Sequence, residues 1–249
     1  MSMSVNTTTD SIDSASEVIS AFRTANAAEY GRIASRINGL RGYFLASDPS
    51  TQKEILKKSY VYSALTANTA VQFADESYGR WIAGEDIRRS TYATAAITNQ
   101  KGEWIHSTLD RFDEAAEPVL EAMRQENWYK AGELCAEQFK GVARIKGHFT
   151  IALISGKTAC LDTHTVDFLN THTDMNTIDK RSVAKQPEVY KEGVKRLKST
   201  HDGLVFMSQW VAFDYQKSDK QTDLSDWVDE LESSSIETHD LFYDSLPMP

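Results

Sequence analysis

Apolar residues recur at three- and four-residue steps along most of this 249-residue chain. Val18, Ile19, Phe22 and Ala25 open the pattern near the N-terminus. Residues three or four positions apart lie on the same face of a helix, so this spacing is typical of amphipathic helices. No stretch of any length alternates apolar and polar residues as a half-buried strand does, and no internal repeat is present. The sequence therefore predicts an all-α fold.

Turn residues divide the periodic segments into separate helices. Short N-terminal helices are expected to stop at Asn38-Gly39 and again at Ser47–Ser50. A longer helical run over residues 53–82 is expected to break near Thr66–Thr69. Residues 171–186 are expected to form a polar loop. Further helices are predicted over residues 90–97, 103–123, 128–139, 188–198 and 204–215.

The chain is expected to form a single domain with a short disordered start. Residues 1–16, MSMSVNTTTDSIDSAS, are rich in serine and threonine and are predicted to be disordered. Residues 17–249 are long enough to bury a sizeable core. Residues 219–249 form an acidic tail that is expected to keep the surface solvated, with mimicry of DNA charge or docking of a partner as alternatives. Its expected apolar anchors are Trp227, Leu231, Leu241 and Phe242.

Charge and cysteine usage narrow the class of protein. The formal net charge of −9 argues against an indiscriminate nucleic-acid coat, but a small basic patch on an acidic body can still bind DNA. Cys135 and Cys160 lie in apolar stretches and are expected to be reduced core residues. No apolar run approaches the roughly 20 residues of a membrane span, and no signal peptide is recognisable. We therefore expect no membrane partner and a location in the cytoplasm of a bacterium or an infected host cell.

The clearest chemical signals lie in residues 130–170. A helix over residues 130–139 is expected to end in a turn, Lys140-Gly141-Val142-Ala143-Arg144, in which Gly141 is free to adopt a positive φ angle. The turn leaves backbone N–H groups unpaired at the positive end of a second helix, where a phosphate oxygen binds well. Lys140 and Arg144 add positive charge. The second helix carries Lys146 and an inward-facing apolar set: Ile145, Phe149, Ile151, Ala152 and Ile154.

Asp162 is the second residue of interest in this region. Ser155-Gly156-Lys157 stops the lysine-bearing helix, and Leu161-Asp162-Thr163-His164 is expected to open the next one. Aspartate is a favoured N-cap residue, so a purely structural role for Asp162 is one reading and a chemical role is the other. His164 and His172 lack the spacing of a zinc site, and we expect them to be solvated polar groups.

The order of these features resembles the helix-hairpin-helix DNA glycosylase superfamily, which includes endonuclease III-type enzymes and 8-oxoguanine glycosylases. GVARIKG (residues 141–147) and LDTH (residues 161–164) resemble the family motif PGVGxKTA…VDTH. In viral relatives GLGLVKAGF…GCLDTH is similar to GVARIKGHF…ACLDTH here. YSALTANTAVQFADESYGRW resembles the family helix around LLSAQTxxxxA, with Asn68 at the polar position. The resemblance covers roughly residues 55–170 and implies a helical fold with two lobes flanking a cleft.

The resemblance also implies roles for individual residues. The turn would hold the DNA backbone through main-chain N–H groups of Val142–Arg144, and Asn68 would enter the duplex where the target nucleotide is rotated into a pocket. Asp162 would stabilise oxocarbenium character on the sugar. Lys146, if unprotonated, would attack C1′ and give strand-cleaving activity. His164 would brace the helix of Asp162 or meet a phosphate.

Three functions stay open on this sequence. The first is excision of a base from DNA, with or without strand cleavage. The second is a viral type of transferase that adds an amine or amino acid to an activated 5-methyl group of a pyrimidine and leaves the glycosidic bond intact. The third is a non-catalytic DNA- or protein-binding module in which Asp162 is only a cap. No cofactor is expected, and two cysteines cannot supply the four-cysteine iron–sulfur motif of cellular relatives.

An aromatic set on the run over residues 53–82 is expected to pack in the core, with one or two rings open to stacking on a flipped base. The members of this set are Tyr60, Tyr62, Phe73, Tyr78 and Trp81.

Overall fold

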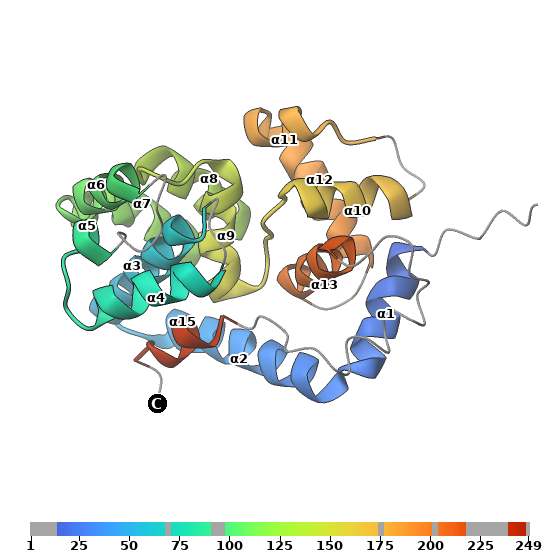
Figure 1. Ribbon diagram of the computed structural model, residues 1–249, viewed down its shortest axis with the longest axis horizontal. Helices are drawn as coiled ribbons and strands as arrows, with labels where there is room; N and C mark the ends of the chain where they lie inside the picture. The colour runs from blue at the N-terminus through green and yellow to red at the C-terminus, as the bar shows by residue number, and fades with distance from the viewer. Residues whose placement is uncertain are drawn as a thin grey trace, which may run out of the picture.

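The computed structural model describes residues 14–67, 71–90, 98–173, 177–200, 204–217 and 239–247. Within these ranges every regular element is a helix, which confirms the predicted all-α class (Figure 1). The helices are α1 (Ala15–Ala25), α2 (Ala27–Ala46), α3 (Pro49–Leu65), α4 (Val71–Ile82), α5 (Ile87–Ser90), α6 (Thr98–Leu109), α7 (Phe112–Arg124), α8 (Trp128–Gln138), α9 (Arg144–Ser155), α10 (Thr163–His172), α11 (Lys180–Lys185), α12 (Pro187–Thr200), α13 (Val205–Lys217) and α15 (Asp240–Asp244).

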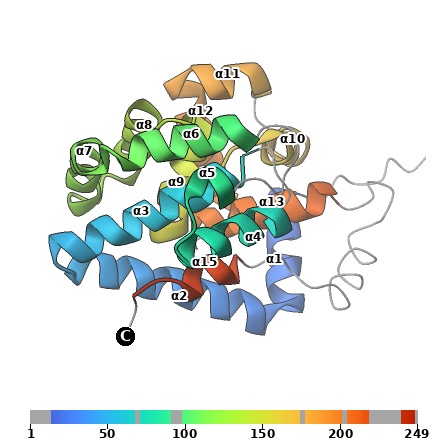
Figure 2. The same cartoon turned by 60° about the vertical axis from the view of Figure 1, so that its left-hand side comes forward.

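Helix α9 lies in the interior of the molecule, with α2, α3 and α8 packed against it (Figure 2). Every residue from Gly147 to Ser155 is buried. Helices α8 and α9 approach most closely where Gly132 faces α9 and Gly147 faces α8. A Cβ atom on Gly147 would lie 2.6 Å from the carbonyl oxygen of Gly132, so this crossing requires glycine. The predicted hairpin of two helices is thus a closely packed pair.

Helices α10, α12 and α13 pack on one another, and α1 contacts all three (Figure 1). The long helix α2 runs along one side of the molecule from α1 to α3 and α9. The chain passes from α9 to the α10 group through a short link, residues 156–162. Asp162 lies at the end of this link, whereas Lys146 lies in the first turn of α9, at the other end of that helix.

The C-terminal helix α15 makes ion pairs, a hydrogen bond and a ring contact with α2, α9 and α3. Arg36 of α2 forms ion pairs of 2.5 Å with both Asp240 and Asp244. The Tyr243 hydroxyl donates a hydrogen bond of 3.1 Å to the Leu153 carbonyl, and the ring of Phe242 stacks on Tyr62 with centroids 5.4 Å apart. A segment far along the sequence is thereby placed beside the end of α3.

The predicted stop at Asn38-Gly39 is wrong, because α2 continues through both residues. The apolar spacing carries on across the pair in buried Ile33, Ile37, Leu40 and Phe44. Asn38 also accepts a hydrogen bond of 2.7 Å from Arg41 one turn later. A glycine inside a helix costs about 1 kcal/mol. Burial of two large apolar side chains beyond it contributes more than that.

The helix predicted over residues 103–123 is two helices, because the chain breaks at Asp110-Arg111 between α6 and α7. The break brings Phe112, the first residue of α7, against the rings of Tyr60 and Phe139, with centroids 6.3 and 5.4 Å away. Tertiary aromatic packing therefore overrides the continuous helical pattern.

The polar loop predicted over residues 171–186 contains a short helix, α11. The Asp179 side chain caps it by accepting from the backbone N–H groups of Arg181 and Ser182. Val183 is its single buried residue, so the segment has no apolar periodicity by which it could be recognised.

Smaller differences concern the two ends of the chain. Helix α1 begins at Ala15 behind a capping box of Ser14 and Glu17, two residues before the predicted boundary of the domain. Phe242 is buried as expected for an anchor of the acidic tail, whereas Leu241 is 40% exposed and does not serve as one. Trp227, Leu231 and the predicted helical residues 91–97 lie outside the described residues.

Cys135 and Cys160 are both buried and unpaired, as predicted. None of the described helices combines the length and the apolar character that a membrane crossing requires.

Candidate functional site

The turn between α8 and α9 has the backbone geometry predicted for it. Gly141 has a φ angle of +84°, and a Cβ atom there would lie 3.4 Å from the side chain of Trp104 on α6. Ala143 occupies the N-cap position of α9 and offers no side-chain acceptor. Within the described part of the chain, no acceptor takes a hydrogen bond from the backbone N–H groups of Val142, Ala143 or Arg144. These donors remain for a ligand or for water.

The two basic residues of the turn differ in their surroundings. Lys140 is exposed, and its Nζ atom donates to the Ser107 hydroxyl at 3.0 Å. Arg144 is held by protein acceptors, with Nε 2.7 Å from Glu133 Oε1 and Nη1 2.9 Å from the Ala184 carbonyl. Only Lys140 can meet an incoming anion without giving up an ion pair.

Glu133 and His148 form a buried polar connection between α8 and α9. Glu133 Oε1 accepts from His148 Nε2 at 3.0 Å, and His148 Nδ1 lies 2.8 Å from the Thr158 hydroxyl. Burial lowers the pKa of His148, so its imidazole is neutral. Burial alone would raise the pKa of Glu133, but the hydrogen bonds from His148 and Arg144 outweigh it and lower the pKa to about 2. This connection fixes the start of the link that leads to Asp162.

Tyr190 of α12 holds the end of the same link. Its hydroxyl donates to the Ala159 carbonyl at 2.5 Å and accepts from the Leu161 N–H at 3.2 Å. Its ring stacks on His148 with centroids 4.3 Å apart. Tyr190 and His148 hold the link on which Asp162 lies, and no pattern in the sequence indicated either residue.

Asp162 is the N-cap residue of α10, as predicted. Its Oδ1 atom accepts from the Thr165 N–H at 2.9 Å and from the Thr165 hydroxyl at 3.0 Å. No described residue donates to Oδ2, and the side chain is partly exposed. One carboxylate oxygen is thus used in the cap, and the other is available. His164, two residues later, packs edge-on against the ring of Phe213 at 5.2 Å.

Lys146 points toward the end of α3. Its Nζ atom donates to the Thr66 hydroxyl at 3.2 Å and lies 4.7 Å from the centre of the Phe149 ring. No carboxylate in the described part of the chain pairs with it. The residue is partly exposed, and among the described residues its ammonium group has neither a counter-ion nor a full set of acceptors.

Lys146 and Asp162 both act on the thiol of Cys160. Burial raises the pKa of Cys160 to about 12, the positive charge of Lys146 lowers it and the negative charge of Asp162 raises it. Screening limits such interactions to roughly 10 Å, so both charged groups lie within Coulomb range of one buried sulfur atom. Lys146 and Asp162 themselves contact different residues, Thr66 and Phe149 for the first and Thr165 for the second.

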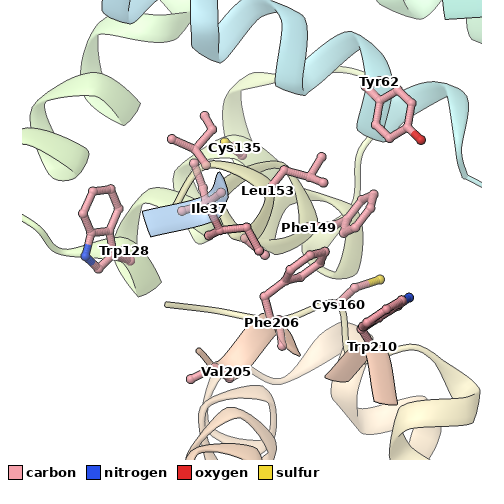
Figure 3. Close-up of a cluster of buried hydrophobic side chains, with 14 of the residues drawn as sticks. Ile37, Tyr62, Trp128, Cys135, Phe149, Leu153, Cys160, Val205, Phe206 and Trp210 are labelled. Carbon is pink, nitrogen blue, oxygen red and sulfur yellow. The ribbon is translucent and has the colours of Figure 1, made fainter. Parts of the chain in front are cut away.

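Three further residues adjoin this region. The Tyr62 hydroxyl lies 2.9 Å from Asp75 Oδ1 and 2.8 Å from His239 Nδ1. Burial, together with the charge of Lys146, lowers the pKa of His239 to about 4. The His239 ring meets Phe149 edge-on at 5.6 Å. Figure 3 shows Tyr62, Phe149 and Cys160 along one side of the buried apolar cluster.

Of Tyr62, Asp75 and His239, only Tyr62 had been singled out from the sequence. Tyr62 belonged to the aromatic set expected in the core, and its ring is buried there. Asp75 and His239 had no recognisable pattern, because they reach Tyr62 from α4 and from the residue before α15. Asn68, the residue predicted to enter the DNA duplex, lies outside the described residues.

Comparisons of the chain with family models, with curated proteins and with solved structures found no match.

Proposed function

We propose that this chain is a DNA base-processing enzyme with a helix-hairpin-helix DNA glycosylase-like fold, in which two lobes flank a cleft for a flipped nucleotide. The observation that carries the proposal is that Lys146 has no carboxylate partner and Asp162 Oδ2 has no donor among the described residues, while both side chains lie within Coulomb range of the Cys160 thiol. An amine and a carboxylate placed together suit a reaction in which a sugar gains positive charge and is attacked by a nucleophile.

The turn between α8 and α9 supports the DNA-binding part of the proposal. The unpaired N–H groups of Val142–Arg144 and the positive end of α9 would hold a backbone phosphate. Lys140 would attract the DNA phosphate in a salt-dependent way. Arg144 could contact the phosphate only by breaking or sharing its ion pair with Glu133. Asn68 and His164 keep the roles that the resemblance implies for them, in the duplex and near Asp162.

The chemistry follows from two groups. When the N-glycosidic bond breaks, its electron pair goes to the base, which takes up a proton, and positive charge builds on the sugar. The Oδ2 atom of Asp162, which no described residue hydrogen-bonds, would stabilise that charge. The amine of Lys146, in its unprotonated form, would form a bond to C1′. Loss of a proton and opening of the sugar ring then give a Schiff base and an associated lyase activity.

Mass-spectrometric nucleoside analysis of DNA incubated with the protein tests the proposal. The wild type is expected to release a free base, and Asp162→Asn is expected to abolish that release. Asparagine caps a helix nearly as well as aspartate, so this variant removes the charge and keeps the cap. Asp179→Asn, at the equivalent cap of α11, is the matched control and should retain activity.

Two other results would identify the alternative functions. A mass increase on pyrimidine nucleosides without base release identifies a base-modifying transferase on the same fold. DNA binding without any chemical change, unaffected by Asp162→Asn, identifies a binding module. Either result contradicts excision of a base.

A further inference from the structure

An exposed aromatic residue lies beside the turn between α8 and α9. Trp104 of α6 is 37% exposed, and its side chain would lie 3.4 Å from a Cβ atom at Gly141. One helical turn later on α6, the Ser107 hydroxyl accepts a hydrogen bond of 3.0 Å from Lys140 Nζ. Trp104 and the exposed Lys140 are therefore neighbours on the surface where α6 meets the turn.

Arg111, which lies between α6 and α7, continues this surface. It is exposed, and its Nη2 atom donates to the Gln138 carbonyl at 3.0 Å. Arg111, Lys140 and Trp104 thus lie in sequence order along residues 138–141, which lead into α9. The turn is flanked on the α6 side by two cations followed by an aromatic ring.

The positive charge of this surface is not neutralised by the protein. Neither Lys140 nor Arg111 forms an ion pair with a carboxylate of the described residues, Glu103 of α6 included. Asp110, which precedes Arg111, lies instead 3.4 Å from His106 Nε2. The chain as a whole carries a net charge of −9, so a local pair of uncompensated cations directs an anionic partner to this place.

We propose that Trp104, Lys140 and Arg111 form a binding surface for an unpaired strand of DNA that continues from the phosphate at the turn. A positively charged surface follows the backbone of a single strand, and an aromatic side chain stacks on one of its bases. A base inside a duplex is covered by its neighbours, so stacking on Trp104 requires an open strand. Placement of this strand beside a flipped nucleotide rests on the function proposed above, whereas binding of a single strand requires only the three side chains.

Binding of a fluorescent single-stranded oligothymidylate to the purified full-length chain, followed by anisotropy, tests the surface. Trp104→Leu is expected to weaken binding about fivefold or more, because one stacked base is lost. Trp104→Phe keeps an aromatic face and should retain most of the affinity. Ile82→Ala, which shortens another exposed apolar side chain, on α4, is the control and should bind as the wild type does.

The salt dependence of the same binding tests the two cations. Lys140→Gln and Arg111→Gln should each reduce the slope of log affinity against log salt by about 0.7, the value for one phosphate contact of a single strand. Lys195→Gln removes one charge at an exposed position of α12 and should leave the slope unchanged. A poly-glutamate peptide of the same length is the control ligand and should bind far more weakly, because it has no bases to stack on Trp104.

Equal affinity of the wild type and Trp104→Leu for the oligothymidylate overturns the inference. So does a loss that Trp104→Phe shares in full, or equal binding of poly-glutamate, since either result removes the role of base stacking. Base release that depends on Asp162 would in those cases leave the proposed function intact. Strand binding that depends on Trp104, without any base release, supports this surface and contradicts the proposed excision.

Discussion

At the scale of single residues, Asp162 uses its two oxygens differently. Oδ1 completes the cap of α10, and no described residue donates to Oδ2. A residue that served only as a cap would need the first oxygen alone. Asp162 can therefore cap α10 with one oxygen and still offer the other for chemistry. Substitutions that remove the charge or the cap test the two roles one at a time.

Asp162→Ala is expected to lower the free energy of unfolding by about 1 kcal/mol, because the cap of α10 is lost. Asp162→Asn should lower it by no more than a few tenths of a kcal/mol. Urea denaturation of both variants measures the difference. Equal and large losses for the two variants would mean that the charge of Asp162, and not its cap, stabilises the fold.

Lys101 of α6 is buried, and its Nζ atom donates to the Leu65 carbonyl at 3.2 Å. Lys101→Met is expected to stabilise the protein at pH 7, because it removes a buried charge. The pKa of Lys101 is about 8 in the folded state and near 10.5 in the unfolded chain, so the unfolded state binds more protons between these values. Stability of the wild type should consequently rise with pH across that window, by up to ~1.4 kcal/mol per pH unit, and is lowest below it.

The methionine variant should lose this rise, which denaturant unfolding at pH 7, 8, 9 and 10 would measure. A variant that is less stable than the wild type at pH 7 would contradict the cost of burying a protonated lysine at this position, to which the charge of Lys146 adds. Lys195→Met, at an exposed position of α12, controls for the change in net charge.

At the scale of elements, the α8–α9 pair depends on close contact at two glycines. Gly147→Ala is expected to lower stability by ~1–3 kcal/mol, because its Cβ atom would lie 2.6 Å from the Gly132 carbonyl oxygen. Gly39→Ala is the matched control inside a helix, since a Cβ atom there meets nothing within 4 Å. It should raise stability by up to about 1 kcal/mol. Thermal and urea unfolding of both variants would show whether the two effects have opposite signs.

His239, the residue before α15, makes the free energy of unfolding depend on pH. The pKa of His239 is lowered to about 4 in the folded state, so the unfolded chain binds more protons between about pH 6.5 and 4. Stability should fall as the pH drops through that window, by up to ~1.4 kcal/mol per pH unit from this residue.

His239→Asn should reduce the slope while keeping the fold, because asparagine tolerates the φ angle of 53° at this position better than most residues do. The remaining dependence of stability on pH would come in part from His148, because burial lowers the pKa of this residue as well. An unchanged slope in His239→Asn would show that this imidazole is not buried in the folded protein.

At the scale of the whole molecule, local signals in the sequence predicted the class of fold and the elements that carry the site. Periodicity predicted helices, Gly141 predicted the turn, and Asp162 predicted the cap of α10. Each of these depends on residues within a few positions of one another. The break after α3 at Thr66 was also predicted from its neighbours.

The surroundings of Lys146 could not be predicted in the same way. Lys101 reaches the end of α3 from α6, and His239 reaches Tyr62 across 177 positions of the chain. No spacing rule connects such residues, because tertiary packing alone brings them together. The same reason explains why α2 continues through Asn38-Gly39, where packing of later residues outweighs a local stop signal.

The central claim is that Lys146 and Asp162 serve one bound nucleotide. A double-mutant cycle of base-release rates under single-turnover conditions, with Lys146→Gln, Asp162→Asn and the combined variant, tests it most directly. We predict that each substitution slows release and that the combined variant is about as slow as the slower single one. Effects that multiply, or a rate that neither substitution changes, would contradict the claim that the two side chains work together.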